Sequence, residues 1–150
     1  MKNLKLLSLM IAAVCLAACH KDQTGLTGKW QEVKVISRSV DNSTGAITAD
    51  TTHGRFGSFD YAILGGDTLI ISSSLPPNGQ LIQKYTRSRT ANGYALAPFY
   101  MDSGNVSVDL LPTMDTMINI TANSFVVHSV SIPGHAPNNK TYIFDAYYSK

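Results

Sequence analysis

Cys19 is the clearest candidate for a chemical modification, because its thiol follows an N-terminal segment typical of exported proteins. Lys2 and Lys5 make the N-terminus positive, and an apolar run broken by a single serine occupies residues 6–14. Small side chains then precede the cysteine. The pattern is typical of a secretory signal peptide, and the run is shorter than the roughly 20 apolar residues of a membrane-spanning helix. We therefore expect residues 1–18 to be removed as a signal peptide.

The segment Leu16–Cys19 reads Leu-Ala-Ala-Cys and resembles the lipobox of bacterial lipoproteins. In that family the cysteine sulfur receives a diacylglycerol, and the signal peptidase then cuts immediately before the cysteine. The resemblance implies that Cys19 attaches the mature chain to a membrane, with residues 19–27 as a lipidated tether. Two or three acyl chains would attach the protein stably to a membrane, since each buried CH₂ contributes about 0.8 kcal/mol. An ordinary signal peptide that happens to contain a cysteine is the alternative.

The residues around the cysteine bear on where the chain is anchored. In some Gram-negative lipoproteins an aspartate directly after the lipobox cysteine retains the protein in the inner membrane, whereas here His20 follows. Lys21 and Asp22 partly resemble a surface-export signal of other Gram-negative lipoproteins. The resemblance implies that the anchor lies in the outer membrane, on either its periplasmic or its cell-surface face. Because Cys15 leaves with the leader, the mature chain has no pair of cysteines for a disulfide.

No familiar catalytic or metal-binding motif stands out in the rest of the sequence. No Gly-x-Ser-x-Gly elbow surrounds a serine, and no glycine-rich phosphate loop is present. The ten carboxylates lie mostly at predicted turns, where aspartate supports turn geometry. The histidines outside the leader, none at a metal-binding interval from a second strong ligand, are His20, His53, His128 and His135. We expect no enzyme, no cofactor and no metal, with a hydrolase as the alternative.

The charge balance argues against nucleic acid as a partner. The chain has twelve Lys and Arg against ten Asp and Glu, and the excess is Lys2 and Lys5 in the expected leader. Basic residues are scattered, whereas nucleic-acid binding needs a basic patch or stripe. The expected partners are the membrane, through the acyl anchor on Cys19, and either a small ligand or another protein.

The region after the tether consists of short runs rich in β-branched and aromatic residues, separated by Gly, Asn, Asp and Pro. We expect turns at Gly65–Asp67 and Asn92–Gly93, the latter of type I′. Residues 38–54 are expected to form the longest loop, or alternatively a short hairpin or a lid. Pro98 makes its strand an edge strand or ends it early. The predicted strands cover residues 28–36, 58–63, 68–72, 81–89, 94–100, 106–110, 117–120, 125–130 and 141–148.

This spacing predicts an all-β fold, an antiparallel meander of about eight or nine strands that forms a barrel. A β-sandwich is the alternative. No linker interrupts residues 28–150, so we expect them to form one domain. In the strand 58–63, Phe59, Tyr61 and Ile63 share one face, and the small and polar residues share the other.

At Gly28–Trp30 the chain resembles the lipocalin superfamily, which opens its first strand with Gly-x-Trp. In that family the tryptophan packs over the closed end of an eight-stranded barrel. The resemblance implies the same structural roles for Gly28 and Trp30 and a lipocalin-like domain over residues 28–150. The family also carries an arginine near the last strand that stacks on the tryptophan. Here the basic residues in that region are Lys140 and Lys150.

Aromatic residues are the best candidates for ligand binding, because tyrosine offers apolar area with a polar tip. Strand propensity alone also accounts for many of them. His128 alternates with Val126 and Val130 and is expected to be a hydrogen-bonded wall residue. The ligand-binding candidates are Tyr61, Tyr85, Phe125, His128, Tyr142 and Phe144. We expect the domain to bind a small apolar or amphipathic ligand; a surface interaction or accessory lipoprotein without such a ligand is the alternative.

Overall fold

The computed structural model describes residues 26–53, 60–75, 79–104 and 111–150. The expected signal peptide 1–18, Cys19 and the tether up to residue 25 lie outside these residues. The same holds for Phe59 and for the predicted strand 106–110.

Nine strands and one short 3₁₀ helix make up the described part of the chain. In order they are β1 (Gly28–Asp41), β2 (Ile47–His53), β3 (Tyr61–Gly65), β4 (Thr68–Leu75), β5 (Gly79–Thr90), β6 (Gly93–Asp102), β7 (Thr113–Ile118), β8 (Ser124–Ser131), η1 (Pro137–Asn139) and β9 (Lys140–Ser149). The turn expected at Gly65–Asp67 is confirmed, since β3 ends at Gly65 and β4 begins at Thr68.

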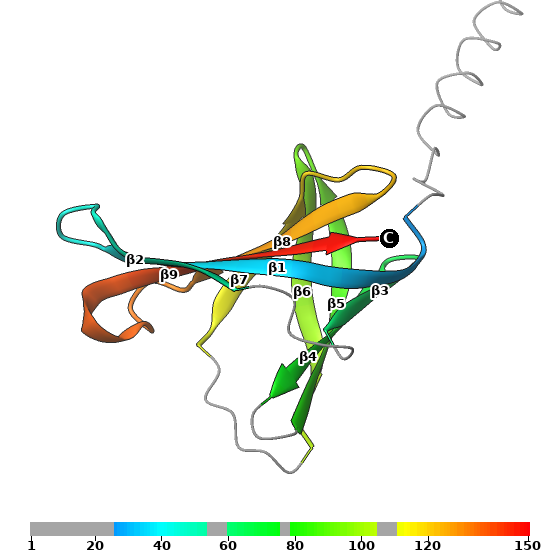
Figure 1. The fold of residues 1–150 in the computed structure, drawn as a ribbon, viewed down its shortest axis with the longest axis horizontal. Helices are drawn as coiled ribbons and strands as arrows, with labels where there is room; N and C mark the ends of the chain where they lie inside the picture. Colours follow the sequence, from blue (N-terminus) through cyan, green and yellow to red (C-terminus); the bar gives the residue numbers. More distant parts are fainter. Residues whose placement is uncertain (1–25, 54–59, 76–78, 105–110) are drawn as a thin grey trace, which may run out of the picture.

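Pairing of the first strand with the last closes the sheet into a barrel (Figure 1). One edge of β1 pairs with β9 over Gln31–Asp41. Its other edge pairs with β3 over Gly28–Gln31 and with β2 over Val35–Val40. Strands β3 to β9 follow one another as antiparallel neighbours, so eight strands close the barrel and β2 is an extra strand. The predicted all-β, lipocalin-like meander is confirmed, and the β-sandwich alternative is wrong.

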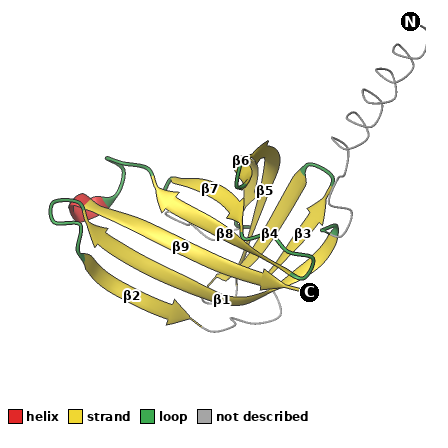
Figure 2. Ribbon diagram, turned by 90° about the horizontal axis from the view of Figure 1, so that it is seen from above, coloured by secondary structure: helices red, strands yellow, loops and turns green. Residues whose placement is uncertain are grey.

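The hairpin of β1 and β2 replaces most of the loop expected over residues 38–54, and Figure 2 shows β2 alongside β1. The side chain of Asp41 forms the turn, because its Oδ1 accepts hydrogen bonds from the backbone N–H of Ser43 and Thr44 at 2.8 and 2.9 Å. These bonds lower the pKa of Asp41. The long-loop expectation is therefore wrong, and the hairpin alternative is correct.

A β-bulge at Val33 changes which side chains of β1 face the barrel interior. Glu32 pairs with Tyr148, whereas Lys34 pairs with Tyr147, so Val33 is the extra residue. Before the bulge, even-numbered residues such as Trp30 face inward. After it the inward positions are odd-numbered, as shown by the pairing of Val35 with the core-packed Ala146.

The turn between β5 and β6 differs from the predicted type I′ turn. Ala91 and Asn92 are its central residues, and neither has a positive φ. Gly93 follows them with a φ of +151°, and a Cβ at this position would lie 2.0 Å from the carbonyl oxygen of Met117 on β7. Gly93 is therefore required by the close approach of β6 to β7 rather than by the twist of the β5–β6 hairpin.

Pro98 lies in β6 where this strand leaves its neighbour. Pairing of β6 with β7 covers only Tyr94–Leu96, and a bulge between β5 and β6 leaves Phe99, directly after Pro98, as the extra residue. Among the described residues, the second half of β6 thus has a free edge, which suits a residue without a backbone N–H. The expectation of an edge is confirmed for that half, whereas the strand itself continues to Asp102.

Replacing Gly93 by alanine is expected to lower the free energy of unfolding by about 2 kcal/mol or more, because the new Cβ collides with the Met117 carbonyl. Gly65→Ala is the matched control, since nothing lies within 4 Å of the added carbon and no positive φ is required. Urea unfolding of both variants measures the difference. Equal stabilities would contradict the close approach of β6 and β7.

Candidate functional site

An aromatic plug seals one end of the barrel. Trp30 is fully buried, and its Nε1–H donates to the carbonyl of Leu26 at 2.9 Å. Its ring meets Phe125 edge to face with centroids 5.0 Å apart, and Phe125 stacks on Tyr148 at 4.9 Å. Nζ of Lys150 lies 4.7 Å from the centroid of the Trp30 ring. A lysine therefore takes the place for which the lipocalin resemblance implies an arginine.

Glu32 lies on the inner face beside this plug and is 5% exposed. The hydroxyl of Tyr148 donates to its Oε2 at 3.3 Å. Burial, followed by the nearby charge of Asp60, raises the pKa of Glu32 from 4.5 to about 7, and the bond from Tyr148 offsets part of this rise. Burial and the neighbouring Glu32 also raise the pKa of Tyr148. Glu32 therefore changes charge near neutral pH inside the barrel.

Asp60 is a second inward carboxylate, held at the start of β3. Its Oδ1 accepts the backbone N–H of Ser74 at 2.6 Å, and its carbonyl accepts the N–H of Glu32 at 3.0 Å. The other carboxylate oxygen, Oδ2, is buried without a hydrogen-bond partner. A buried acceptor without a partner costs free energy, so this arrangement is not explained by stability alone.

Asp115 on β7 is the third inward carboxylate and is 8% exposed. Its Oδ1 also lacks a hydrogen-bond partner. Tyr85 on β5 is buried nearby, and its pKa is raised by burial first and then by Asp115. In the sheet, Asp115 stands directly opposite Ser129 of β8 and Leu96 of β6. These residues form a polar layer that crosses the barrel above the plug.

Asp115 also marks the boundary between a sealed and an accessible part of the inner face. Along β7, Met117 on the plug side is fully buried, whereas Thr113 on the other side is partly exposed. Phe144 and Tyr142 of β9 face inward by register, since they share a face with Tyr148, and both are partly exposed. Beyond the polar layer, Thr113, Tyr142 and Phe144 are therefore partly open to solvent, whereas the inner-facing Ser39 and Ser131 are buried.

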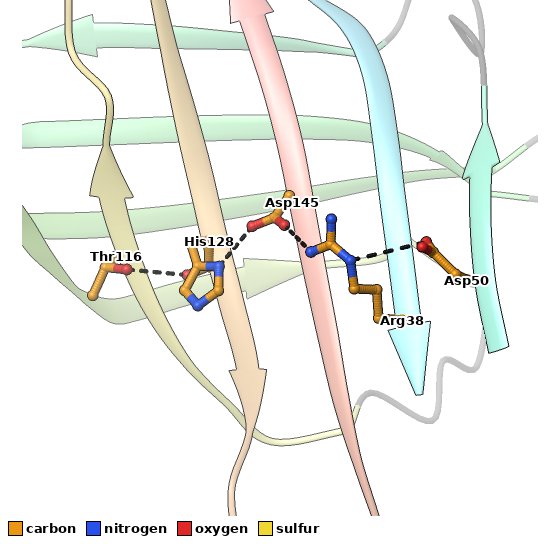
Figure 3. A network of polar contacts seen from close by, with 5 residues as sticks. All are labelled: Arg38, Asp50, Thr116, His128 and Asp145. Carbon is orange, nitrogen blue, oxygen red and sulfur yellow. Dashed lines mark hydrogen bonds and ion pairs between the residues drawn. The ribbon is translucent and has the colours of Figure 1, made fainter. Parts of the chain in front are cut away.

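A chain of polar contacts crosses the outer face of the barrel (Figure 3). One carboxylate oxygen of Asp145 on β9 lies 2.6 Å from Nδ1 of His128 on β8. The other oxygen lies 2.7 Å from Nη1 of Arg38 on β1. Arg38 continues to Asp50 of β2 at 3.9 Å, and the Thr116 hydroxyl of β7 donates to the backbone carbonyl of His128 at 3.3 Å. The bond to Asp145 raises the pKa of Arg38. Because the hydroxyl meets the backbone and not the imidazole, this group lacks the nucleophile–base bond that hydrolysis needs.

The six ligand-binding candidates are not brought to one place. Tyr85 and Phe125 lie in the buried interior, and Tyr142 and Phe144 lie on its accessible part. Tyr61 and His128 lie on the outer face of the barrel, away from the other four.

These two side chains face outward because their neighbours on the same strands pack into the core. On β3, Ala62 and Leu64 join the core, and Tyr61 instead packs under Nζ of Lys29 at 4.1 Å. On β8 the core residues Phe125 and Val127 place His128 on the opposite face.

Sequence reasoning missed the three inward carboxylates, Glu32, Asp60 and Asp115. Aspartate and glutamate are typical of turns and exposed faces, so composition does not indicate burial. One signal was present: Asp115 lies between Met114 and the strand former Thr116, without a glycine, proline or asparagine beside it.

Scans of the chain against family models, characterised proteins and solved structures return no match. In the described ranges, no helix is both long and apolar enough to cross a membrane. Over the same ranges, no three His, Cys, Asp or Glu side chains are grouped so that they could hold a metal ion. What the site can do therefore has to follow from its own geometry.

The raised pKa of Glu32 predicts that the stability of the folded protein depends on pH. Its pKa is about 7 in the folded protein and 4.5 ordinarily, so between these values the folded state holds a proton that the unfolded state loses. The stabilisation is therefore complete below pH 4.5 and is lost as pH rises through 7, with a size on the order of 3 kcal/mol.

Glu32→Gln should remove most of this dependence and make the protein more stable than wild type above pH 7. Denaturant unfolding over a pH series measures it. Asp67→Asn, the same chemical change on an exposed turn, serves as the control and should keep the wild-type slope. If the two variants share one pH profile, Glu32 does not hold the proton.

Proposed function

We propose that the protein is a lipid-anchored binding protein of the outer membrane whose lipocalin-like barrel holds a small amphipathic ligand. The observation that carries this proposal is the division of the inner face into a sealed end and an accessible part. A barrel of eight strands is wide enough for one small ligand. Phe144 and Tyr142 supply apolar contact on the accessible part, and Asp115 with Tyr85 supplies polar groups at its floor.

The anchor and the accessible part lie at opposite ends of the barrel in this proposal. Leu26 is buried against Trp30 at the sealed end, so the tether that begins at Cys19 reaches the domain there. The accessible inner face is then turned away from the acyl chains. A ligand would enter from the aqueous side rather than directly from the bilayer.

A surface interaction protein is the second candidate, and one observation favours it. Three consecutive side chains of β6, Phe99, Tyr100 and Met101, are 58%, 43% and 52% exposed. They follow the point at which β6 stops pairing with β7 among the described residues. Exposed apolar side chains on a free strand edge are a common docking surface for another chain.

Cys19→Ser is expected to release the protein from membranes, because serine offers no sulfur for the diacylglycerol. Fractionation of host cells measures the shift from the membrane pellet to the soluble fraction. Cys15→Ser, within the expected leader, is the matched control and should leave the protein in the membranes. Membrane retention of Cys19→Ser would contradict the lipid anchor and leave the barrel unaffected.

Native mass spectrometry of the protein extracted from its own host is expected to show a small molecule that is lost on denaturation. Ser37→Trp should abolish this adduct, because Ser37 pairs with Phe144 on the accessible inner face. Ser88→Trp places the same side chain at an exposed outer position of β5 and should keep it. A bare mass for wild type together with a stoichiometric protein partner would favour the second candidate.

A further inference from the structure

We infer that the ligand is an organic cation, an ammonium or guanidinium group on an apolar body, bound with its charged group at Asp115. This inference rests on the proposed small-molecule function and adds the chemical class of the ligand. It follows from which charges face the interior, which of them lack partners, and which of them a ligand can reach.

The charged groups of the polar layer are predominantly acidic. Glu32, Asp60 and Asp115 all face inward, and none of them takes part in an ion pair among the described residues. Arg87 of β5 is the basic side chain in register with this layer, since it pairs with Leu96, the residue opposite Asp115.

The guanidinium of Arg87 forms no ion pair with these carboxylates among the described residues, and its Nε and Nη1 are buried without a hydrogen-bond partner. It lies 4.7 Å from the ring centroid of Tyr94 and donates to the carbonyl of Gly66. The interior therefore presents more negative than positive groups. A carboxylate or phosphate ligand would be repelled there, and a cation would be attracted.

Asp115 and Asp60 each have one carboxylate oxygen that is buried without a hydrogen-bond partner. The backbone N–H of Ser74 binds one oxygen of Asp60, and Glu32 can take up a proton near neutral pH. Asp115 Oδ1 has neither solvent nor a hydrogen-bond partner. A buried carboxylate in that condition is costly unless a cation or a donor compensates it.

Asp115 is also the one of the three beside the accessible part of the barrel. Ser129, directly opposite it, and Thr113, two residues along β7, are short and partly exposed. Glu32 lies beside the plug and is bonded by Tyr148, and Asp60 is more deeply buried than Asp115, at 2% against 8% exposed.

The surroundings of Asp115 suit an organic cation rather than a metal ion. No three ligating side chains of the described residues are grouped to hold a metal. Aromatic faces are present instead, from Tyr85 at the floor and from Phe144 and Tyr142 beyond it. Aromatic rings attract ammonium and guanidinium groups and also contact an apolar body.

Three compounds with the same ten-carbon chain separate charge from apolar burial: decylamine, decanol and decanoate. Isothermal titration calorimetry on the wild-type protein, below micelle formation and at neutral pH, compares their affinities. We expect decylamine to bind at least about tenfold more tightly than decanol, and decanoate to bind most weakly.

Two variants test whether Asp115 is the counter-charge. Asp115→Asn should bring decylamine to within about threefold of decanol, while decanol binding stays near wild type. Ser129→Lys places an ammonium group opposite Asp115 and should likewise abolish the preference, and it gives the test a second route if Asp115→Asn does not fold. Asp67→Asn removes the same charge on an exposed turn and should leave the preference unchanged.

The outcomes separate this inference from the proposed function. Similar affinities for all three compounds would overturn the cationic assignment and leave an amphiphile-binding barrel. No binding of any of them would overturn both. A decylamine preference that survives in both Asp115→Asn and Ser129→Lys, or that is lost in Asp67→Asn, would show that the cation binds elsewhere.

Discussion

The pairing of β1 with β9 is the constraint on which the rest of this structure depends. It closes the meander into a barrel and brings the two ends of the domain together. Closure places Lys150 from the last residues of the chain on the ring of Trp30 near its start. Residues 26–150 contain no cysteine, so this backbone ladder and the aromatic plug perform the closure that disulfides often secure in exported domains.

The interior combines two demands that oppose one another. The plug is tightly buried and apolar and stabilises the fold. The polar layer beside it buries carboxylates, two of which carry an oxygen without a hydrogen-bond partner, and this lowers stability. Such local costs are frequently found at functional sites, where the rest of the structure compensates for them. Here the apolar contacts of the sealed end offset the cost of the buried carboxylates. The proposed ligand site lies toward the opposite end of the barrel.

The outer contacts of Arg38, His128 and Asp145 explain how the accessible part of the wall stays ordered. Inner-facing residues there are partly exposed and contribute less apolar burial than those of the plug. Asp145 compensates by tying β8 to β1 across the outside of β9, through His128 on one side and Arg38 on the other. Cross-strand pairs of this kind contribute modestly one by one, but here one buried acid serves two strands.

The sequence by itself determined the fold class, most turns and the motif at the sealed end. Alternating apolar residues and short glycine-containing turns specify strands locally, and Gly28–Trp30 marks the first of them. It left the β1–β2 hairpin as an alternative to a long loop, because that turn depends on hydrogen bonds to the Asp41 side chain.

Only the tertiary structure decided which face of each strand is inside. Alternation shows that two faces differ, but the choice between them depends on register with strands far away in the chain. On β3 it turned Ala62 inward and Tyr61 outward, and on β1 the bulge at Val33 exchanged the two faces midway. The three inward carboxylates follow from the same register, so the candidate site exists only once the barrel has closed.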